Sequence, residues 1–243
     1  MMKTKLTWKS RGAACLVAGL LAWGAPAQAD ETPGDPFESF NRAMFAVNEG
    51  IDMVAMKPIA QAYDFVVPLP AKAGVGNFFG NILDFRNVLN NALQGKGADA
   101  GTDLARLLIN STIGIFGLFD VASELGLERH DEDFGQTLAV WGWADSDFLF
   151  WPIIGPRTVR DTGGWVVDAY TDPTWYTINK TVAARNSLLA LLFVDVRASL
   201  LPTDKVVEEA ALDKYAYVRD AYLQRRRNQI FDGRPPRLED VLD

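Results

Sequence analysis

No apolar run in residues 30–243 is long enough to cross a bilayer, although 49% of the chain is hydrophobic. A membrane-spanning helix needs about 20 predominantly apolar residues in succession. The best candidates are residues 188–194, which Asp195 interrupts, and residues 113–119, which lie between Thr112 and Asp120. A chain this apolar without a span either packs a dense core or lies in a membrane interface.

Residues 1–29 have the three parts of a cleavable export signal. The basic part contains Lys3, Lys5, Lys9 and Arg11 and no acidic residue. An apolar stretch follows at 12–23, and Ala27-Gln28-Ala29 offers small residues to a signal peptidase. We therefore predict export and cleavage after Ala29.

The only cysteine, Cys15, lies inside this signal. A bacterial lipobox has a leucine-like residue three positions before the cysteine, after an apolar run. Here Gly12 holds that position, and the apolar run follows Cys15. We predict that the protein is not a lipoprotein, with lipidation of Cys15 as the alternative.

The charge balance is acidic. The chain has 24 basic and 31 acidic residues, a net charge of −7. Loss of the four basic residues of the signal would leave 20 basic and 31 acidic residues, a net charge of −11. Nucleic-acid binding requires a basic face, so we predict no nucleic-acid partner. Any membrane contact has to come from apolar burial rather than attraction to anionic lipid.

Hydrophobic periodicity predicts an all-α fold, without a sheet. We expect a first helix from a cap at Asp35 to Pro58, a second over 71–94 and a third over 99–109 with Leu104, Leu107 and Leu108 inward. A short helix is expected at 120–125, another from Thr158 to about Tyr170, and a long one from 172 to about 201, ended by Pro202. A last helix runs from 203 to about 231, and residues 126–157 are predicted to be irregular.

The predicted helix over 71–94 has two contrasting faces. Val75, Phe78, Ile82, Phe85, Leu89 and Leu93 share one face, and Arg86 falls within this stripe. The opposite face carries Asn77, Asp84, Asn87, Asn91 and Gln94. Solvated helix faces usually carry Lys and Glu rather than neutral amides. The amide face is therefore either an unusual solvent face or one wall of a polar passage.

The residue inventory does not favour catalysis. Residues 30–243 contain one histidine, His130, and no cysteine, and no Gly-x-Ser-x-Gly motif is present. The acidic neighbours of His130 could bind a cation, but a solvated loop explains them as well. We predict no enzymatic activity, no metal and no cofactor, with a carboxylate-based hydrolase as the alternative.

Aromatic residues gather between residues 141 and 151. Indole rings favour the membrane interface, where the ring is buried and its N–H stays hydrated. Packing in an ordinary core is the alternative. The candidate interface residues are Trp141, Trp143, Phe148, Phe150 and Trp151. Arg225, Arg226 and Arg227 are interpreted as a solvated helix end, with docking to an acidic partner as the alternative.

The motifs together resemble the MlaA/VacJ family over residues 34–231. They include Asp35-Pro36-Phe37-Glu38-Ser39-Phe40-Asn41-Arg42, Val67-Pro68-x-Pro70, Gly76-Asn77-Phe78, Leu93-Gln94-Gly95, Asn110-Ser111-Thr112-Ile113-Gly114, Phe119-Asp120-Val121-Ala122, the residues Phe134, Gln136, Thr137 and Leu138 around Gly135, Arg160-Asp161-x-Gly163 and residues 215–225. The resemblance implies a ring-like bundle of amphipathic helices around a polar channel, in the outer membrane on its periplasmic side. It also implies that phospholipids leave the outer leaflet through this channel for a periplasmic carrier, which maintains lipid asymmetry, and that a trimeric porin is a partner.

The resemblance and the polarity of the helices together predict a lipid pathway. Its candidate residues are Asn41, Asn48, Asn77, Asp84, Asn91, Gln94, Arg160 and Asp161. We expect a short lead at 30–34, a helical domain at 35–231 and a mobile acidic tail at 232–243. Most family members carry an acylated cysteine just before this domain. None is present there, so interfacial helices or a porin would have to anchor the protein. A soluble periplasmic lipid-binding or scaffold protein is the alternative function.

Overall fold

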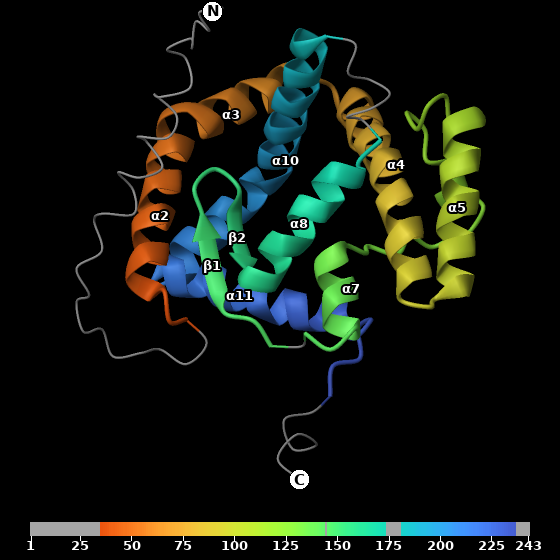
Figure 1. Cartoon of the computed structure of the whole chain (residues 1–243). Coiled ribbons are helices and arrows are strands. Elements are labelled where there is room, and N and C mark those ends of the chain that lie inside the picture. The colour runs from red at the N-terminus through yellow and green to blue at the C-terminus, as the bar shows by residue number, and fades with distance from the viewer. Residues whose placement is uncertain (1–34, 144, 174–180, 237–243) are drawn as a thin grey trace, which may run out of the picture.

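The computed structural model describes residues 35–143, 145–173 and 181–236. The predicted signal and lead lie outside the described residues, as do residues 237–243 of the predicted tail. The first described elements are α2 (Glu38–Ile51), a π-helical turn η2 (Asp52–Met56) and α3 (Lys57–Val66). They follow one another without a break and form a curved arm (Figure 1).

The prediction that Pro58 ends the first helix is wrong. Lys57 has helical backbone angles, φ −60° and ψ −49°, and Pro58 lies in the first turn of α3. A proline inside a regular helix clashes with the carbonyl four residues earlier. The wider π turn of η2 lies directly before this point, so it gives the proline ring room.

Asp35 was also misassigned as a cap. The cap position of α2 is Phe37, which makes no side-chain cap bond. The Asp35 carboxylate is buried, where it accepts hydrogen bonds from Asn41 Nδ2 (2.7 Å) and from the Tyr215 hydroxyl. Asp35 therefore ties the start of α2 to the last described helix.

The next elements form an antiparallel pair. Helix α4 (Leu69–Leu93) confirms the prediction for 71–94, and α5 (Gly97–Thr112) confirms the helix predicted over 99–109. A turn with Gly95 at φ +80° joins them. The short helix α6 (Val121–Glu124) follows, with the Asp120 side chain capping its first turn through Ser123 N.

Residues 126–157 are more regular than predicted. They include α7 (Phe134–Val140) and an antiparallel hairpin of β1 (Phe148–Trp151) and β2 (Gly155–Thr158), which runs directly into α8 (Val159–Thr171). The strands are too short for a period-two pattern to be recognised in the sequence. The all-α class is nevertheless confirmed, because this hairpin is the only sheet among the described residues.

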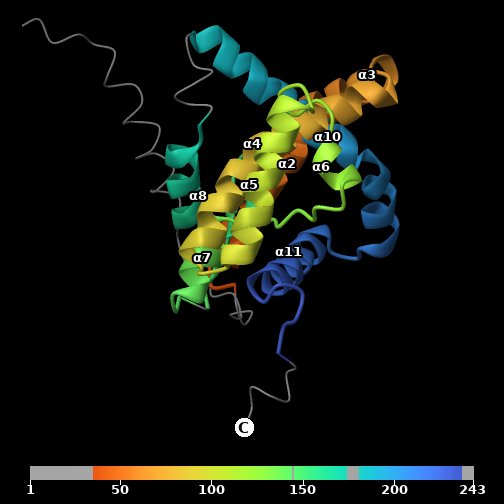
Figure 2. The same cartoon turned by 90° about the vertical axis from the view of Figure 1, so that its right-hand side faces the viewer.

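The last described helices are α10 (Val182–Ala210) and α11 (Lys214–Ile230). Pro202 was predicted to end the long helix, but α10 continues past it and changes direction along its length (Figure 2). A contact across the proline holds the two sides together, because Arg197 Nη2 lies 2.9 Å from the Asp204 carboxylate. The beginning predicted for the long helix falls partly in residues 174–180, outside the described residues.

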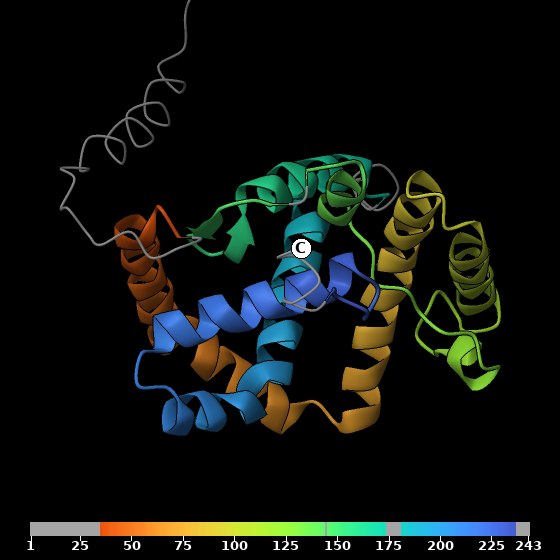
Figure 3. The same ribbon diagram turned by 90° about the horizontal axis from the view of Figure 1, so that it is seen from below.

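Seen from below, the elements follow one another around a ring-like frame (Figure 3). The arm of α2, η2 and α3 forms one part of the frame, α4 another, and α7, α8 and the hairpin the remainder. Helix α11 crosses this frame. At one end Tyr215 bonds to Asp35, and at the other Arg226 contacts Asp133 and Asp161 near α7 and α8.

Uninterrupted apolar runs predicted no membrane-spanning segment, but one described helix is long and apolar enough to cross a membrane, on length and composition alone. It is Val182–Glu209 of α10, which is 6% buried over its most apolar window. Asp195 and Arg197 interrupt its apolar character. They contact the arm, Asp195 through the Tyr63 hydroxyl (2.8 Å) and Arg197 through Asp52 (2.6 Å). One edge of α10 is therefore polar and fixed to the arm, and large apolar side chains remain exposed elsewhere on it.

Candidate functional site: a polar interior and a pocket beside α11

The described residues bury polar side chains and expose apolar ones. Seventeen buried residues are polar or charged, whereas seven are hydrophobic, and forty large hydrophobic residues are exposed. A protein folded in water has the opposite distribution, with paired charges as rare exceptions in its core. The conventional part of the core is a small aromatic cluster of Phe148, Phe150 and Tyr215.

Helix α5 shows this inversion clearly. Its buried residues are Asp103, Arg106 and Asn110. Leu104 and Leu108, predicted to point inward, are 44% and 57% exposed. The periodicity separates the two faces of the helix correctly, but it does not tell which of them meets the rest of the protein.

The face of α4 that carries Asp84 and the asparagines is buried against α5 and the segment before α7. Asp84 lies between Arg129 (2.8 Å) and Arg106 (3.7 Å), and Asn91 donates to Asp103 (2.9 Å). The predicted pathway residue Asn77 is half-buried and donates to the Leu118 carbonyl (3.3 Å).

Gln94, at the other end of α4, donates to Glu132 (2.7 Å) and to the Thr137 hydroxyl (3.2 Å). The side-chain oxygens of Asn91 and Gln94 are buried and accept no hydrogen bond from the described residues. These two amides therefore keep acceptor capacity inside the polar interior.

Asn41 and Asn48 were predicted from their polarity to line the lipid pathway, but their side chains contact the β1–β2 hairpin instead. They lie two turns apart on α2 and bond to the backbone of the hairpin. Asn41 donates to Phe148 O (3.1 Å) and accepts from Phe150 N (2.8 Å), and Asn48 does the same with Trp151 O and Ile153 N. Both ends of each amide are occupied, so these side chains position the hairpin.

Two aromatic residues of the predicted membrane interface belong to the core. Phe148 and Phe150 point to the same side of β1, as residues two apart in a strand do, and they are 0% and 4% exposed. Placing them at an interface was therefore wrong. Trp141 and Trp143 are exposed, and Trp151 is half-buried with its indole N–H donating to the Thr162 hydroxyl.

Arg160 and Asp161, two of the predicted pathway residues, pair with each other, with Arg160 Nε 3.0 Å from the carboxylate. Asp161 also accepts from Arg226 Nη2 (2.8 Å) and from the Tyr222 hydroxyl (2.8 Å). Arg226 in turn makes two 2.6 Å hydrogen bonds to Asp133. A buried ionic cluster therefore joins α8, α11 and the start of α7.

The interpretation of residues 225–227 as a solvated helix end is wrong for Arg226, which is only 6% exposed, whereas the Arg225 side chain is 75% exposed. Burial alone would raise the pKa of Asp133, but the hydrogen bonds and charge of Arg226 outweigh it and lower this pKa to about 2. The pKa of Asp161 is likewise lowered, since the charge of Arg226 outweighs burial.

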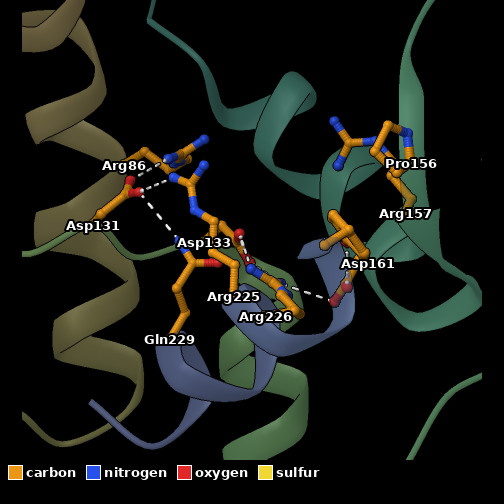
Figure 4. Close-up of a pocket in the computed structure, with 10 residues that line it drawn as sticks. Arg86, Asp131, Asp133, Pro156, Arg157, Asp161, Arg225, Arg226 and Gln229 are labelled. Carbon is orange, nitrogen blue, oxygen red and sulfur yellow. Dashed lines mark hydrogen bonds and ion pairs between the residues drawn. The ribbon is translucent and has the colours of Figure 1, made fainter. Parts of the chain in front are cut away.

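A pocket of about 220 Å³ lies beside the ionic cluster (Figure 4). Its lining comes from α4, the segment before α7, β2, α8 and α11, and includes Arg86, Asp131, Asp133, Pro156, Arg157, Asp161, Tyr222, Arg225, Arg226 and Gln229. Four arginines face three aspartates here, so the pocket carries one net positive charge in an acidic protein. Arg157 was not predicted as a site residue, because it belongs to none of the sequence motifs.

The two ends of the molecule differ in chemistry. At the upper end in Figure 1, the α3–α4 junction, the loop after α5 and the start of α10 expose Phe65 (91%), Phe116 (75%) and Val182 (65%). The lower end contains α11, whose Arg225 and Asp220 side chains are 75% and 63% exposed. The pocket opens beside α11, and hence at the charged end.

No group of three or more His, Cys, Asp or Glu side chains that could hold a metal occurs among the described residues. His130 lies beside Asp99 and Asp103, with Nδ1 3.3 Å from the Asp103 carboxylate. This histidine therefore links the segment before α7 to α5.

The structure therefore defines a class of helical protein in which a ring-like frame buries polar side chains and exposes apolar ones. Such a surface suits an apolar environment rather than water. The chain belongs to the MlaA lipoprotein family, whose model matches residues 33–229. The resemblance noted in the sequence is thereby confirmed.

Relatives and a solved structure agree with this assignment. The chain is 32% identical to the intermembrane phospholipid transport system lipoprotein MlaA of Escherichia coli (strain K12), over 92% of this chain and 88% of the relative. It is 34% identical to an uncharacterized protein of Rickettsia prowazekii, over 81% and 78%. A structure solved in work on the "structural basis for maintenance of bacterial outer membrane lipid asymmetry" matches with a TM-score of 0.70 and 30% identity, over 82% of this chain and 99% of the other.

Proposed function

We propose that this protein transports phospholipids at the bacterial outer membrane. In this proposal it takes phospholipids from the outer leaflet, passes them through its polar interior and delivers them to a periplasmic carrier. The name of the Escherichia coli relative and the subject of the matching structure support the lipid class and the membrane. The proposed role is transport rather than catalysis.

The observation that carries the proposal is the inverted burial. Exposed apolar surface on this scale is unfavourable in water, at roughly 25 cal/mol for each Å². A bilayer removes that cost, because the exposed side chains then contact hydrocarbon. The buried amides and ion pairs meanwhile provide a place where a lipid headgroup keeps polar contacts, which hydrocarbon alone cannot offer.

The chemistry of the two ends suggests an orientation. The end with Phe65, Phe116 and Val182 would lie in the acyl-chain region, and the α11 end would face the periplasm. Helix α4 has 25 residues. At 1.5 Å per residue, it is long enough to reach from the acyl-chain region to the end of the protein that would face the periplasm. Among the predicted pathway residues, Asn91 and Gln94 fit best, since each keeps a buried acceptor without a partner.

Anchoring is proposed to depend on the exposed apolar helices, with a trimeric porin as a further partner. The relatives are named lipoproteins, whereas the one cysteine of this chain lies in the predicted signal. Mass spectrometry of the mature protein decides this question. An unmodified N-terminus at Asp30 supports our proposal, and a lipid on Cys15 contradicts it.

Deletion of the gene, followed by measurement of phospholipid at the cell surface, tests the function. We expect surface phospholipid to rise and to return to normal when the gene is restored. No rise would contradict the transport role. Membrane fractionation separates the alternative, because an embedded protein needs detergent for release, whereas a soluble periplasmic lipid-binding protein does not.

A further inference from the structure

We propose that Arg157 binds the phosphodiester group of a phospholipid headgroup in the pocket beside α11. The proposal rests on the transport function and adds a site to it. Arg157 lies on β2, at the wall of the pocket opposite Arg86 and Asp131 (Figure 4). The pocket is several times larger than the ~30 Å³ occupied by one water molecule, so it has room for a phosphate group.

The acidic groups of the pocket are already engaged by other partners. Asp133 and Asp161 are held by Arg226, and Asp161 also by Arg160 and Tyr222. Asp131 contacts Arg86 (3.3 Å), Arg225 (3.7 Å) and Gln229 (3.3 Å). None of the three aspartates forms an ion pair with Arg157.

The side chain of Arg157 has neither an ion pair nor a hydrogen bond to the part of the chain that the structure describes, and its Nε is buried without a partner. Its guanidinium lies over the ring of Trp165, with Cζ 5.3 Å from the ring centroid. The stacking fixes the direction of the side chain while it leaves the N–H donors unused. Burial lowers the pKa of Arg157, but an arginine remains charged at neutral pH.

Arg157 is half-buried, and its Nε, which is buried without a partner, is unfavourable unless a ligand atom reaches it. The planar guanidinium presents paired N–H groups that match two oxygens of a phosphate. The net charge of the pocket also favours a phosphate, because the pocket has one more arginine than aspartate and is therefore positive. At the charged end of the molecule, such a site would hold a headgroup where it leaves the polar interior for the periplasm.

Binding of a soluble phospholipid to the purified full chain tests the site. Dihexanoyl phosphatidylglycerol is titrated in dodecyl maltoside, a phosphate-free detergent, and the affinity is measured by calorimetry. We expect Arg157→Gln to weaken binding about tenfold, as the loss of a hydrogen bond to a charged group predicts. Arg157→Lys keeps the positive charge but loses the paired N–H groups of the guanidinium, so it should weaken binding less than Arg157→Gln does. Arg234→Gln, which removes an exposed charge outside the pocket, should leave it unchanged.

A measurement on the protein without substitutions tests the site even if a variant misfolds. Phenylglyoxal reacts with arginines, and peptide mass spectrometry reports the rate at each position. The lipid should slow the reaction at Arg157 and leave the rate at Arg234 unaltered. Equal slowing at both, or none at Arg157, would overturn the proposed site.

The source of the phosphate is distinguished by a second titration with inorganic phosphate. Inorganic phosphate that protects Arg157 while the lipid does not would overturn the headgroup assignment. If the lipid binds and Arg157→Gln has no effect, the site is wrong and the transport proposal stands. If the lipid does not bind to the unmodified chain at all, the transport proposal fails together with the site.

Discussion

The Asp133–Arg226 pair makes the stability of the protein depend on pH. The pKa of Asp133 is about 2 in the folded protein, below the ordinary value of 3.8. A lowered pKa contributes stability above the unfolded value, and this contribution is lost as the pH falls through the folded value. We expect roughly 2 kcal/mol of unfolding free energy to disappear between about pH 4 and pH 2.

Chemical denaturation in detergent at several pH values checks this expectation. Asp133→Asn should flatten the dependence over that window, because it removes the group that titrates. Asp220→Asn serves as the control, since the Asp220 side chain is 63% exposed and exposed ion pairs contribute little. An equally steep acid limb in Asp133→Asn would show that other carboxylates cause it.

The bonds from Asn41 to the hairpin give a second prediction at this scale. Asn41→Ala leaves the Phe148 carbonyl and the Phe150 N–H without their partner in a buried site. Since unsatisfied buried groups cost about 1–3 kcal/mol each, we expect a loss of about 3 kcal/mol or more. Asn186→Ala, at an exposed position on α10, is the control. A loss for Asn41→Ala as small as that for Asn186→Ala would contradict the structural role of this amide.

Among the elements, α4 and α5 show what a single sequence can predict. Their length and the division into two faces follow from periodicity, because a helix repeats every 3.6 residues in any solvent. Which face is buried depends on the surroundings, and this is why Leu104 and Leu108 were assigned to the wrong side. The π turn before Pro58 and the hairpin depend on contacts between distant residues, which local patterns do not contain.

The crossing of α7 and α8 depends on two glycines. A Cβ on Gly164 would lie 2.3 Å from Gly135 N, whereas one on Gly163 would have no atom within 4 Å. Gly164→Ala should therefore separate the helices and lower the free energy of unfolding by about 1–3 kcal/mol. Gly163→Ala is the matched control and should be neutral or stabilising by up to ~1 kcal/mol, since alanine favours helix.

Thermal unfolding of the two variants in the same detergent measures the difference. Because Gly135 also lies against Arg226 and Asp161, Gly164→Ala should disturb the ionic cluster as well as the crossing. Equal unfolding temperatures for the two variants would show that the close approach is not required.

For the whole molecule, the site was only partly predictable. Family motifs identified Arg160 and Asp161. The pocket, however, combines residues from five segments of the chain. Its excess of arginine over aspartate exists only once folding has brought these segments together. The orientation in the membrane follows in the same way from the sum of exposed residues rather than from any one helix.

That orientation is open to direct measurement, because the chain has a single cysteine, in the predicted signal. In the protein without residues 1–29, Phe116→Cys and Arg225→Cys each provide one site for an environment-sensitive fluorophore. With phospholipid vesicles, the label at 116 should shift its emission to the blue and be quenched by labels on the acyl chains. The label at 225 should do neither, because α11 is expected to face water. Equal behaviour at both positions would contradict the orientation, and a water-like spectrum at 116 would favour a soluble lipid-binding protein.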